Sequence, residues 1–278
     1  MSLTLMYITN DPEIALIAEN NDVEWIFVDL EILGKSERQK GKDSVISNHN
    51  ADDIKKLKSV LKKSKVLVRI NPINKNTPNE IKKVYDNGAD IIMLPYFKSL
   101  NEVEVFLKNI SGKNLKNIIL IETPESVELI EELIKIDEID YFYIGLNDLS
   151  LGYGFSFMFE PLANGIVDKL ALKINSVNKR FGFGGIASLG KGTLPAEYII
   201  AEHYRLGSSM VILSRSFCNS QKIENKDEIE KIFSSEIKKI RDYEKDIEKK
   251  EIYFFEQNRE KVKEIVKKIN ERVDGFRN

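Results

Sequence analysis

Residues 117–152 have the sequence NIILIETPESVELIEELIKIDEIDYFYIGLNDLSLG, which predicts a strand, a helix and a second strand. Ile118–Ile121 and Tyr141–Ile144 are short apolar runs of the kind found in strands buried on both faces. Pro124 opens the predicted helix between them. The apolar side chains that share one face of this helix are Val127, Ile130, Leu133 and Ile134.

Each of these two strands is followed by a carboxylate. Glu122 ends the first strand and Asp148 comes just past the second. Neighbouring strands of a parallel sheet carry their carboxyl ends to the same edge, so we expect the two acids to meet there. Two converging carboxylates repel each other unless a proton or a hard divalent cation neutralises them. The pair therefore predicts a metal site.

The same alternation of strand and helix continues in both directions along the chain. The predicted strands are Leu3–Ile8, Glu24–Leu30, Lys65–Ile70, Asp90–Leu94, Ile118–Ile121, Tyr141–Ile144, Phe181–Ile186 and Ser209–Leu213. Eight parallel strands with helices between them favour an α/β fold, the (β/α)8 TIM barrel, over an open sheet. A barrel of this type takes about 250 residues, so the 278-residue chain is predicted to form a catalytic barrel over residues 1–219 and a helical C-terminal extension over residues 220–278.

The extension carries an amphipathic pattern. Its apolar residues at helical spacing are Ile229, Phe233, Ile237, Ile240 and Ile247, followed by Val262, Ile265, Ile269 and Val273. One closing barrel helix plus a solvated segment accounts for part of this length, but an apolar stripe has to be buried somewhere. We predict that part of it packs on a neighbouring subunit, as in a homo-oligomer.

Composition excludes several classes of function. The net charge is −2 with acids and bases mixed, which gives no electrostatic footprint for nucleic acid or an anionic membrane. One cysteine and two histidines exclude an internal disulfide and a structural zinc site. The N-terminus lacks the features of a signal peptide, and no apolar run approaches the ~20 residues that span a bilayer. We expect a soluble, cytoplasmic protein.

Charged and polar residues cluster where the predicted strands end, which is where barrel enzymes carry their chemistry. Arg69 follows the apolar run 66–68, so its guanidinium is expected at the barrel mouth, where a planar set of donors beside a metal suits a carboxylate or a developing enolate oxygen. For Asp29 and Arg215, salt bridges at the rim are the favoured interpretation. Lys35 and Lys98 lie in loop or helix-start positions, which disfavours Schiff-base chemistry.

Five motifs resemble the HpcH/HpaI aldolase and citrate lyase β-subunit family. They are VDLE (28–31), VRINP (68–72), IIMLP (91–95), IETPESVE (121–128) and IGLNDLSLGYG (144–154), of which the last two are the most specific. The resemblance runs from about Leu3 to Phe217. It implies a pyruvate-binding barrel, and the family tends to exchange C-terminal helices between subunits in trimers or hexamers.

The resemblance also implies the roles of individual residues. Glu122 and Asp148 would bind Mg²⁺, or Mn²⁺ or Co²⁺, and Arg69 would hold the keto oxygen of pyruvate or a related 2-oxo acid, with Pro95 and Asp148 also in the substrate site. The implied activity is a divalent-metal-dependent carbon–carbon lyase or aldolase with an aldehyde or thioester co-substrate.

One departure from the family pattern leaves alternatives open. The aldolase branch has a histidine directly after the acid that ends strand two, and here that position is Ile32. Glu31, Lys35, His49 or metal-bound water are the candidates for the proton transfer, and we name Arg69, Glu31 and His49 as catalytic. A citrate-lyase-like thioester lyase and a ligand-binding barrel without turnover are the alternatives.

Two further segments allow both a functional and a plain interpretation. Lys35, Arg38, Lys40 and Lys42 make the loop after strand two basic, which suits either an anionic substrate or a solvated loop. The glycine-rich residues 182–192 follow strand seven, where many barrels bind phosphate, although glycine is also needed wherever the chain turns tightly.

Overall fold

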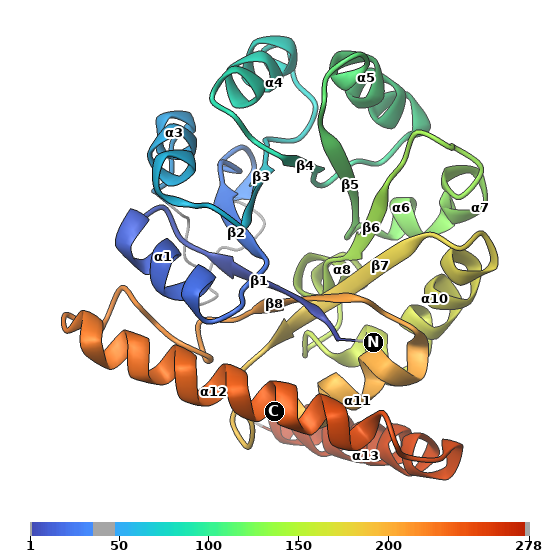
Figure 1. Ribbon diagram of the computed structural model, residues 1–278. Helices are drawn as coiled ribbons and strands as arrows, with labels where there is room; N and C mark the ends of the chain where they lie inside the picture. The colour runs from blue at the N-terminus through green and yellow to red at the C-terminus, as the bar shows by residue number, and fades with distance from the viewer. Residues whose placement is uncertain (1, 36–47, 276–278) are drawn as a thin grey trace.

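The computed structural model describes residues 2–35 and 48–275, with side chains described as far as residue 272. Over these residues the chain forms a closed barrel of eight parallel strands in sequence order, ringed by helices (Figure 1). The strands are β1 Thr4–Ile8, β2 Trp25–Asp29, β3 Lys65–Arg69, β4 Ile91–Leu94, β5 Lys116–Ile121, β6 Tyr141–Ile144, β7 Arg180–Ile186 and β8 Met210–Leu213. The predicted (β/α)8 barrel is thus confirmed.

The helices follow the strands around the outside of the barrel (Figure 1). In the first half they are α1 Pro12–Asn20, α3 Ala51–Val60, α4 Thr77–Asp86, α5 Leu100–Ile110, α6 Pro124–Glu128 and α7 Ile130–Leu133. In the second half they are α8 Leu146–Gly152, α9 Glu160–Ala163, α10 Ile166–Ser176, α11 Ala196–Leu206, α12 Lys226–Ile247 and α13 Ile252–Gly275. The helix predicted from Pro124 is divided at Leu129. Gly165 separates α9 from α10, and its φ of 88° belongs to the left-handed region that glycine adopts readily.

Two apolar cores flank the sheet, because successive side chains of a strand point to opposite faces. The larger core lies between the strands and the helices. The smaller one fills the barrel interior with residues such as Phe27, Leu67, Leu120 and Tyr143. The residues two positions further on along these strands are Asp29, Arg69, Glu122 and Gly145, and the same alternation turns them toward the barrel axis at its carboxyl end.

Packing inside the barrel explains one residue of the glycine-rich segment. A Cβ atom on Gly182 would lie 2.3 Å from Met210 Cγ and 2.6 Å from Tyr143 Cε2, so only glycine leaves room for these two side chains. The Tyr143 hydroxyl donates to the carbonyl of Gly184 and accepts the amide N–H of Ile212, which ties β6 to β7 and β8. Phosphate binding by this segment stays a prediction.

Helices α12 and α13 fall within the predicted extension and pack on the chain's own barrel helices. α12 contacts α1 and α11, and α13 contacts α11 and α9. The five apolar residues of α12 named above are buried, and Phe233 meets the rings of Tyr7 and Phe217 edge-on. The apolar stripe of α12 is therefore covered within one chain, and packing on a neighbouring subunit remains a prediction. In the described part of the chain, no helix has both the length and the apolar character needed to cross a membrane.

Candidate active site at the carboxyl end of the barrel

A cavity of about 550 Å³ opens at the carboxyl ends of the strands. Of the residues predicted for the site, Arg69, Glu122, Asp148 and His49 line it. A ligand pocket typically has a volume of ~300–1,000 Å³, so the cavity is large enough for a small substrate. Glu31 and Pro95 were predicted as site residues but are not among the residues that line it.

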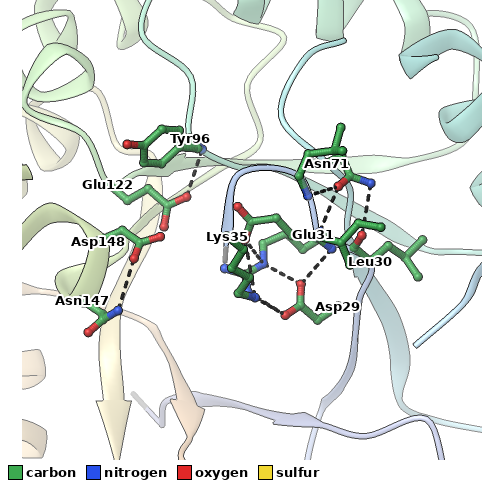
Figure 2. A network of polar contacts seen from close by, with 12 residues as sticks. Asp29, Leu30, Glu31, Lys35, Asn71, Tyr96, Glu122, Asn147 and Asp148 are labelled. Carbon is green, nitrogen blue, oxygen red and sulfur yellow. Dashed lines mark hydrogen bonds and ion pairs between the residues drawn. The ribbon is translucent and has the colours of Figure 1, made fainter. Parts of the chain in front are cut away.

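Glu122 and Asp148 lie side by side at one wall of this cavity. Both are buried, and Figure 2 shows their carboxylates turned toward the same space. They also line a second cavity of about 150 Å³ on the side of Tyr96. The structure therefore brings the two predicted metal ligands to the same rim, as expected for groups that follow neighbouring parallel strands.

Two backbone features hold Glu122 in place. Its Oε1 accepts the amide N–H of Tyr96 at 3.0 Å, and Tyr96 has a φ of 47°, an uncommon value for a bulky residue, at the turn after β4. A Cβ atom on Gly145 would lie 2.8 Å from both Cβ and Oε2 of Glu122. The Glu122 carboxylate can therefore take this position only because residue 145 has no side chain.

Asp148 comes from the first turn of α8, directly after β6. Its Oδ1 accepts a hydrogen bond of 3.2 Å from the side-chain amide of Asn147. The partial positive charge at a helix N-terminus favours an acidic side chain in the first turn. The short connection from β6 to α8 therefore fixes Asp148 beside the carboxylate of the preceding strand.

A second charged group lies across the cavity (Figure 2). Arg69 Nε and Nη2 donate to the two carboxylate oxygens of Asp29 at 2.9 and 2.8 Å, and Lys35 Nζ donates to Asp29 Oδ2 at 2.8 Å. Glu31 completes the cluster, with Oε2 3.4 Å from Arg69 Nε and 3.7 Å from Lys35 Nζ. The predicted rim salt bridge of Asp29 is present, and Glu31 acts within it, behind the cavity wall.

This network fixes the charge states of its members. Burial by itself would raise the pKa of Asp29, but the charges and hydrogen bonds of Arg69 and Lys35 hold the pKa of this carboxyl well below its usual range. Burial opposes the positive charge of Arg69 in the same way, and the carboxylates of Asp29 and Glu31 nevertheless raise the pKa of the guanidinium above its ordinary value. Arg69 is thus a permanent cation in the cavity wall.

His49 reaches the site from the loop that precedes α3. Its Nδ1 accepts the backbone N–H of Asp29 at 3.0 Å, so the proton of the neutral ring sits on Nε2. Burial lowers the pKa of His49, and the negative charges of Asp29 and Asp53 offset only part of this effect. The imidazole is therefore neutral at pH 7 with a defined tautomer.

The carboxylate pair fits a hard divalent cation. Two buried carboxylates side by side repel each other, and two carboxylates with water and substrate oxygens form the ligand set that Mg²⁺ takes in many enzymes. In residues 2–35 and 48–275, no group of three or more His, Cys, Asp or Glu side chains is suitably placed to hold a metal. The pair would therefore supply only part of the coordination shell.

Several residues of the site were not predicted from the sequence. They are the Tyr96 amide, Gly145, and a set of polar side chains from the ends of β1 and β8 that includes Asn10, Asn219 and Gln221. Their position shortly after a strand end is the sequence signal that could have identified them. The segment CNSQ (218–221) follows β8 closely enough to have been counted among the candidate site residues. The other histidine, His203, is not among the residues that line the cavity: it is buried on α11, where its ring stacks on that of Phe183 with the centroids 3.7 Å apart.

A (β/α)8 barrel whose charged groups gather in a cavity at the carboxyl end of its strands has the architecture of a barrel enzyme. The family model described as HpcH/HpaI aldolase/citrate lyase matches residues 3–157, and the chain belongs to this family. Membership makes it an enzyme of the lyase type and confirms the resemblance seen in the motifs. No curated protein sequence gave a significant match.

Solved structures of similar proteins share the fold. The HpcH/HpaI aldolase from Desulfitobacterium hafniense DCB-2 superposes with a TM-score of 0.58 at 16% identity, covering 77% of this chain and 86% of that one. Citrate synthase SbnG gives a TM-score of 0.58 at 19% identity, over 77% of this chain and 87% of that one. Macrophomate synthase gives 0.55 at 15% identity, over 77% of each chain. At these identities the likeness concerns the fold alone.

Proposed function

We propose that the protein is a divalent-metal-dependent carbon–carbon lyase or aldolase that cleaves or forms a bond to the enolate of a pyruvate-type 2-oxo acid. The observation that supports it best is the presence of Glu122, Asp148 and Arg69 in the wall of one cavity. Family membership supports the lyase class, while the metal and the 2-oxo acid are part of the proposal.

Glu122 and Asp148 would hold the metal, for which Mg²⁺ is the first candidate and Mn²⁺ or Co²⁺ the next. A cation bound there would supply a Lewis acid that polarises the keto group of the substrate. The Tyr96 N–H and the first turn of α8 keep the two carboxylates oriented, so little reorganisation is needed when a cation binds.

Arg69 would stabilise the negative charge that develops on the enolate oxygen. Nε and Nη2 are engaged by Asp29, whereas Nη1 has no hydrogen-bond partner among the described residues. A guanidinium that is already anchored on one edge presents its remaining donors without losing much conformational entropy. Asp29 is thus a positioning residue, and Arg69 is the residue proposed to touch the substrate.

His49 would assist at the oxygen of the second substrate. Cleavage of a hydroxy-oxo acid turns this oxygen from a hydroxyl into a carbonyl, and the reverse reaction returns a proton to it. With Nδ1 held by the backbone of Asp29, Nε2–H of the neutral His49 ring can donate a hydrogen bond to this oxygen and so stabilise its negative charge, while water carries the proton itself. This arrangement would take over the orienting part of the role of the family histidine whose position is Ile32 here.

The experiment that tests the proposal is exchange of the methyl protons of pyruvate for deuterium in D₂O, followed by NMR with and without Mg²⁺. Enolate formation requires loss of one methyl proton, so metal-dependent exchange is expected even in the absence of a co-substrate. A barrel that only binds ligands would retain pyruvate without exchanging its protons, and this result would contradict the proposal. A thioester lyase would in addition require a coenzyme A ester for carbon–carbon cleavage.

A further inference from the structure

Glu122 and Asp148 can be reached from two sides. Among the described residues they are the two that line both the large cavity of about 550 Å³ and the small cavity of about 150 Å³. A water molecule takes ~30 Å³ in the liquid, so the small cavity has room for about five waters. The carboxylate pair is therefore a boundary between two spaces, and each of them leads to it.

The charges of the two cavity walls differ once this shared pair is set aside. The other charged side chains described in the wall of the large cavity are the cations Lys35, Arg69 and Arg215 and the anions Asp11 and Asp29. Cations outnumber anions there, whereas Lys98 and Glu125 balance each other in the small cavity. The large cavity therefore attracts an anionic 2-oxo acid and opposes a divalent cation, and the small cavity opposes neither.

The mouth of the small cavity already holds a cation. Lys98 Nζ lies 5.5 Å from the centroid of the Tyr96 ring and donates a hydrogen bond of 3.0 Å to Glu125 Oε1. The side chains of Lys98 and Glu125 are 50% and 44% exposed, so the ion pair stands at the surface, where a side chain changes rotamer within nanoseconds. An aromatic face beside a carboxylate attracts other cations as it attracts this ammonium group.

The remaining walls of the small cavity are fixed. Thr123 is buried, and its side chain caps the start of α6. A Cβ atom on Gly152 would lie 2.6 Å from Pro124 Cδ, so the end of α8 packs directly against this proline. The side chains of Tyr96 and Lys98 therefore set the width of the opening. Figure 2 shows Tyr96 next to Glu122, and neither Tyr96 nor Lys98 lines the large cavity.

We infer that the small cavity is the entrance through which a divalent cation reaches and leaves Glu122 and Asp148, separate from the route of the organic substrate. This inference rests on the proposed function, which assigns the metal to this pair. The Tyr96 ring narrows the passage, and the Lys98 ammonium opposes an incoming positive charge. A residue that only narrows a passage lowers the rates of entry and exit by the same factor and leaves the dissociation constant unchanged.

The test measures the kinetics of Mn²⁺ binding. Stopped-flow mixing with Mn²⁺ and with excess EDTA, followed by a fluorescent indicator of free Mn²⁺, gives the association and dissociation rate constants. Tyr96→Trp keeps the backbone N–H that holds Glu122 and enlarges the ring. Both rate constants are expected to fall at least fivefold, with the Kd within twofold of the wild type. Tyr85→Trp, at an exposed position of α4, is the matched control with unchanged rates.

Two further variants test the charge at the mouth and the alternative route. Lys98→Ala removes the positive charge, so the association rate constant is expected to rise at least threefold at low salt and less at high salt. Lys116→Ala makes the same change in net charge at the start of β5, where Lys116 pairs with Asp140, and should keep the wild-type rates. Met158→Trp narrows the large cavity instead and should leave both rate constants within twofold of the wild type.

The outcomes separate this inference from the proposed function. If Met158→Trp slows Mn²⁺ binding and Tyr96→Trp does not, the cation enters through the large cavity, and the inference is wrong while the proposed function stands. A changed Kd in Tyr96→Trp without the paired change in rates, or wild-type rates in Lys98→Ala, would also overturn it. If Tyr96→Trp does not fold, Lys98→Ala and Met158→Trp still decide. A wild type that does not bind Mn²⁺ would remove the proposed metal site and its entrance together.

Discussion

The guanidinium of Arg69 is joined to the carboxylate of Asp29 by two parallel hydrogen bonds of 2.9 and 2.8 Å. The two residues are direct register partners at the ends of β2 and β3, so the sheet itself sets this contact. Lys35 binds the same carboxylate from the following loop. One buried acid therefore holds both cations of this wall in place.

Removal of the Asp29 charge is expected to destabilise the fold. Asp29→Asn leaves two buried cations with one fewer counter-ion, and breaking a buried ion pair on one side costs about 3–5 kcal/mol. Urea unfolding measures this change. Asp86→Asn, which removes an exposed partner of Lys82, is the matched control and is expected to stay within about 0.5 kcal/mol of the wild type. Equal stability of the two variants would contradict the role given to Asp29.

Loss of either proposed metal ligand is expected to abolish cation binding. Glu122→Gln and Asp148→Asn each replace a hard anionic ligand by a neutral amide, and calorimetric titration with Mg²⁺ or Mn²⁺ is expected to show at least a hundredfold weaker binding. Glu128→Gln, on the exposed face of α6, provides the control with unchanged affinity. Wild-type affinity in both site variants would mean that the metal, if any, binds elsewhere.

Gly145 is expected to control the same site without being a ligand. In Gly145→Ala the new methyl group would lie 2.8 Å from Glu122 Oε2, so this carboxylate has to move away from the position beside Asp148. We expect Mg²⁺ affinity to fall by at least tenfold in calorimetry. Gly112→Asn, where nothing lies within 4 Å of the added Cβ and Asn tolerates the positive φ, should bind like the wild type. An unchanged affinity of Gly145→Ala would show that Glu122 does not depend on this close approach.

His203 is expected to make the protein sensitive to acid. Burial lowers the pKa of His203 to about 3, compared with ~6.5 in an unfolded chain. The unfolded state therefore takes up the proton first as the pH falls, and the free energy of unfolding decreases by about 1.4 kcal/mol per pH unit between pH ~6.5 and ~3, while above pH ~6.5 the contribution is complete.

The variant His203→Phe keeps the stacking surface for Phe183 and removes the titrating group. The hydroxyl of Ser208, which lies 2.7 Å from His203 Nδ1, still has the carbonyl of Phe181 as an acceptor. As the pH is lowered from 7 to 5 in urea titrations, the free energy of unfolding of the variant should rise relative to that of the wild type, because only the wild type loses stability through His203. A difference that does not change with pH would rule out His203 as the source of the acid sensitivity.

Assembly is expected to be a trimer or a hexamer. Sedimentation velocity at micromolar concentration should give three or six times the chain mass of 31.9 kDa. Because the stripe of α12 is already buried within one chain, the contact would have to use other surfaces, among which the start of α13 exposes Ile252 and Tyr253. A species of 31.9 kDa alone would contradict the prediction.

The sequence by itself determined the barrel fold and the end of the barrel at which the charged groups gather. Short apolar runs separated by helical patterns predict buried parallel strands, and a carboxylate or an arginine directly after such a run has to reach the carboxyl rim. Glu122, Asp148 and Arg69 could be predicted for this reason, since their positions depend only on the neighbouring residues of their own strands.

Only the tertiary structure decided which groups from distant segments complete the site. The sequence offered Glu31, Lys35 and His49 as alternatives, and the tertiary structure placed the His49 ring against the backbone N–H of Asp29. Asn219 reaches the cavity because Tyr7, more than two hundred residues earlier, holds the backbone beside it. The partner of the apolar face of α12 could not be predicted from the sequence either. The periodicity of its apolar residues required burial, but the hydrophobic effect is not directional, so the pattern could not distinguish the chain's own barrel from a neighbouring subunit.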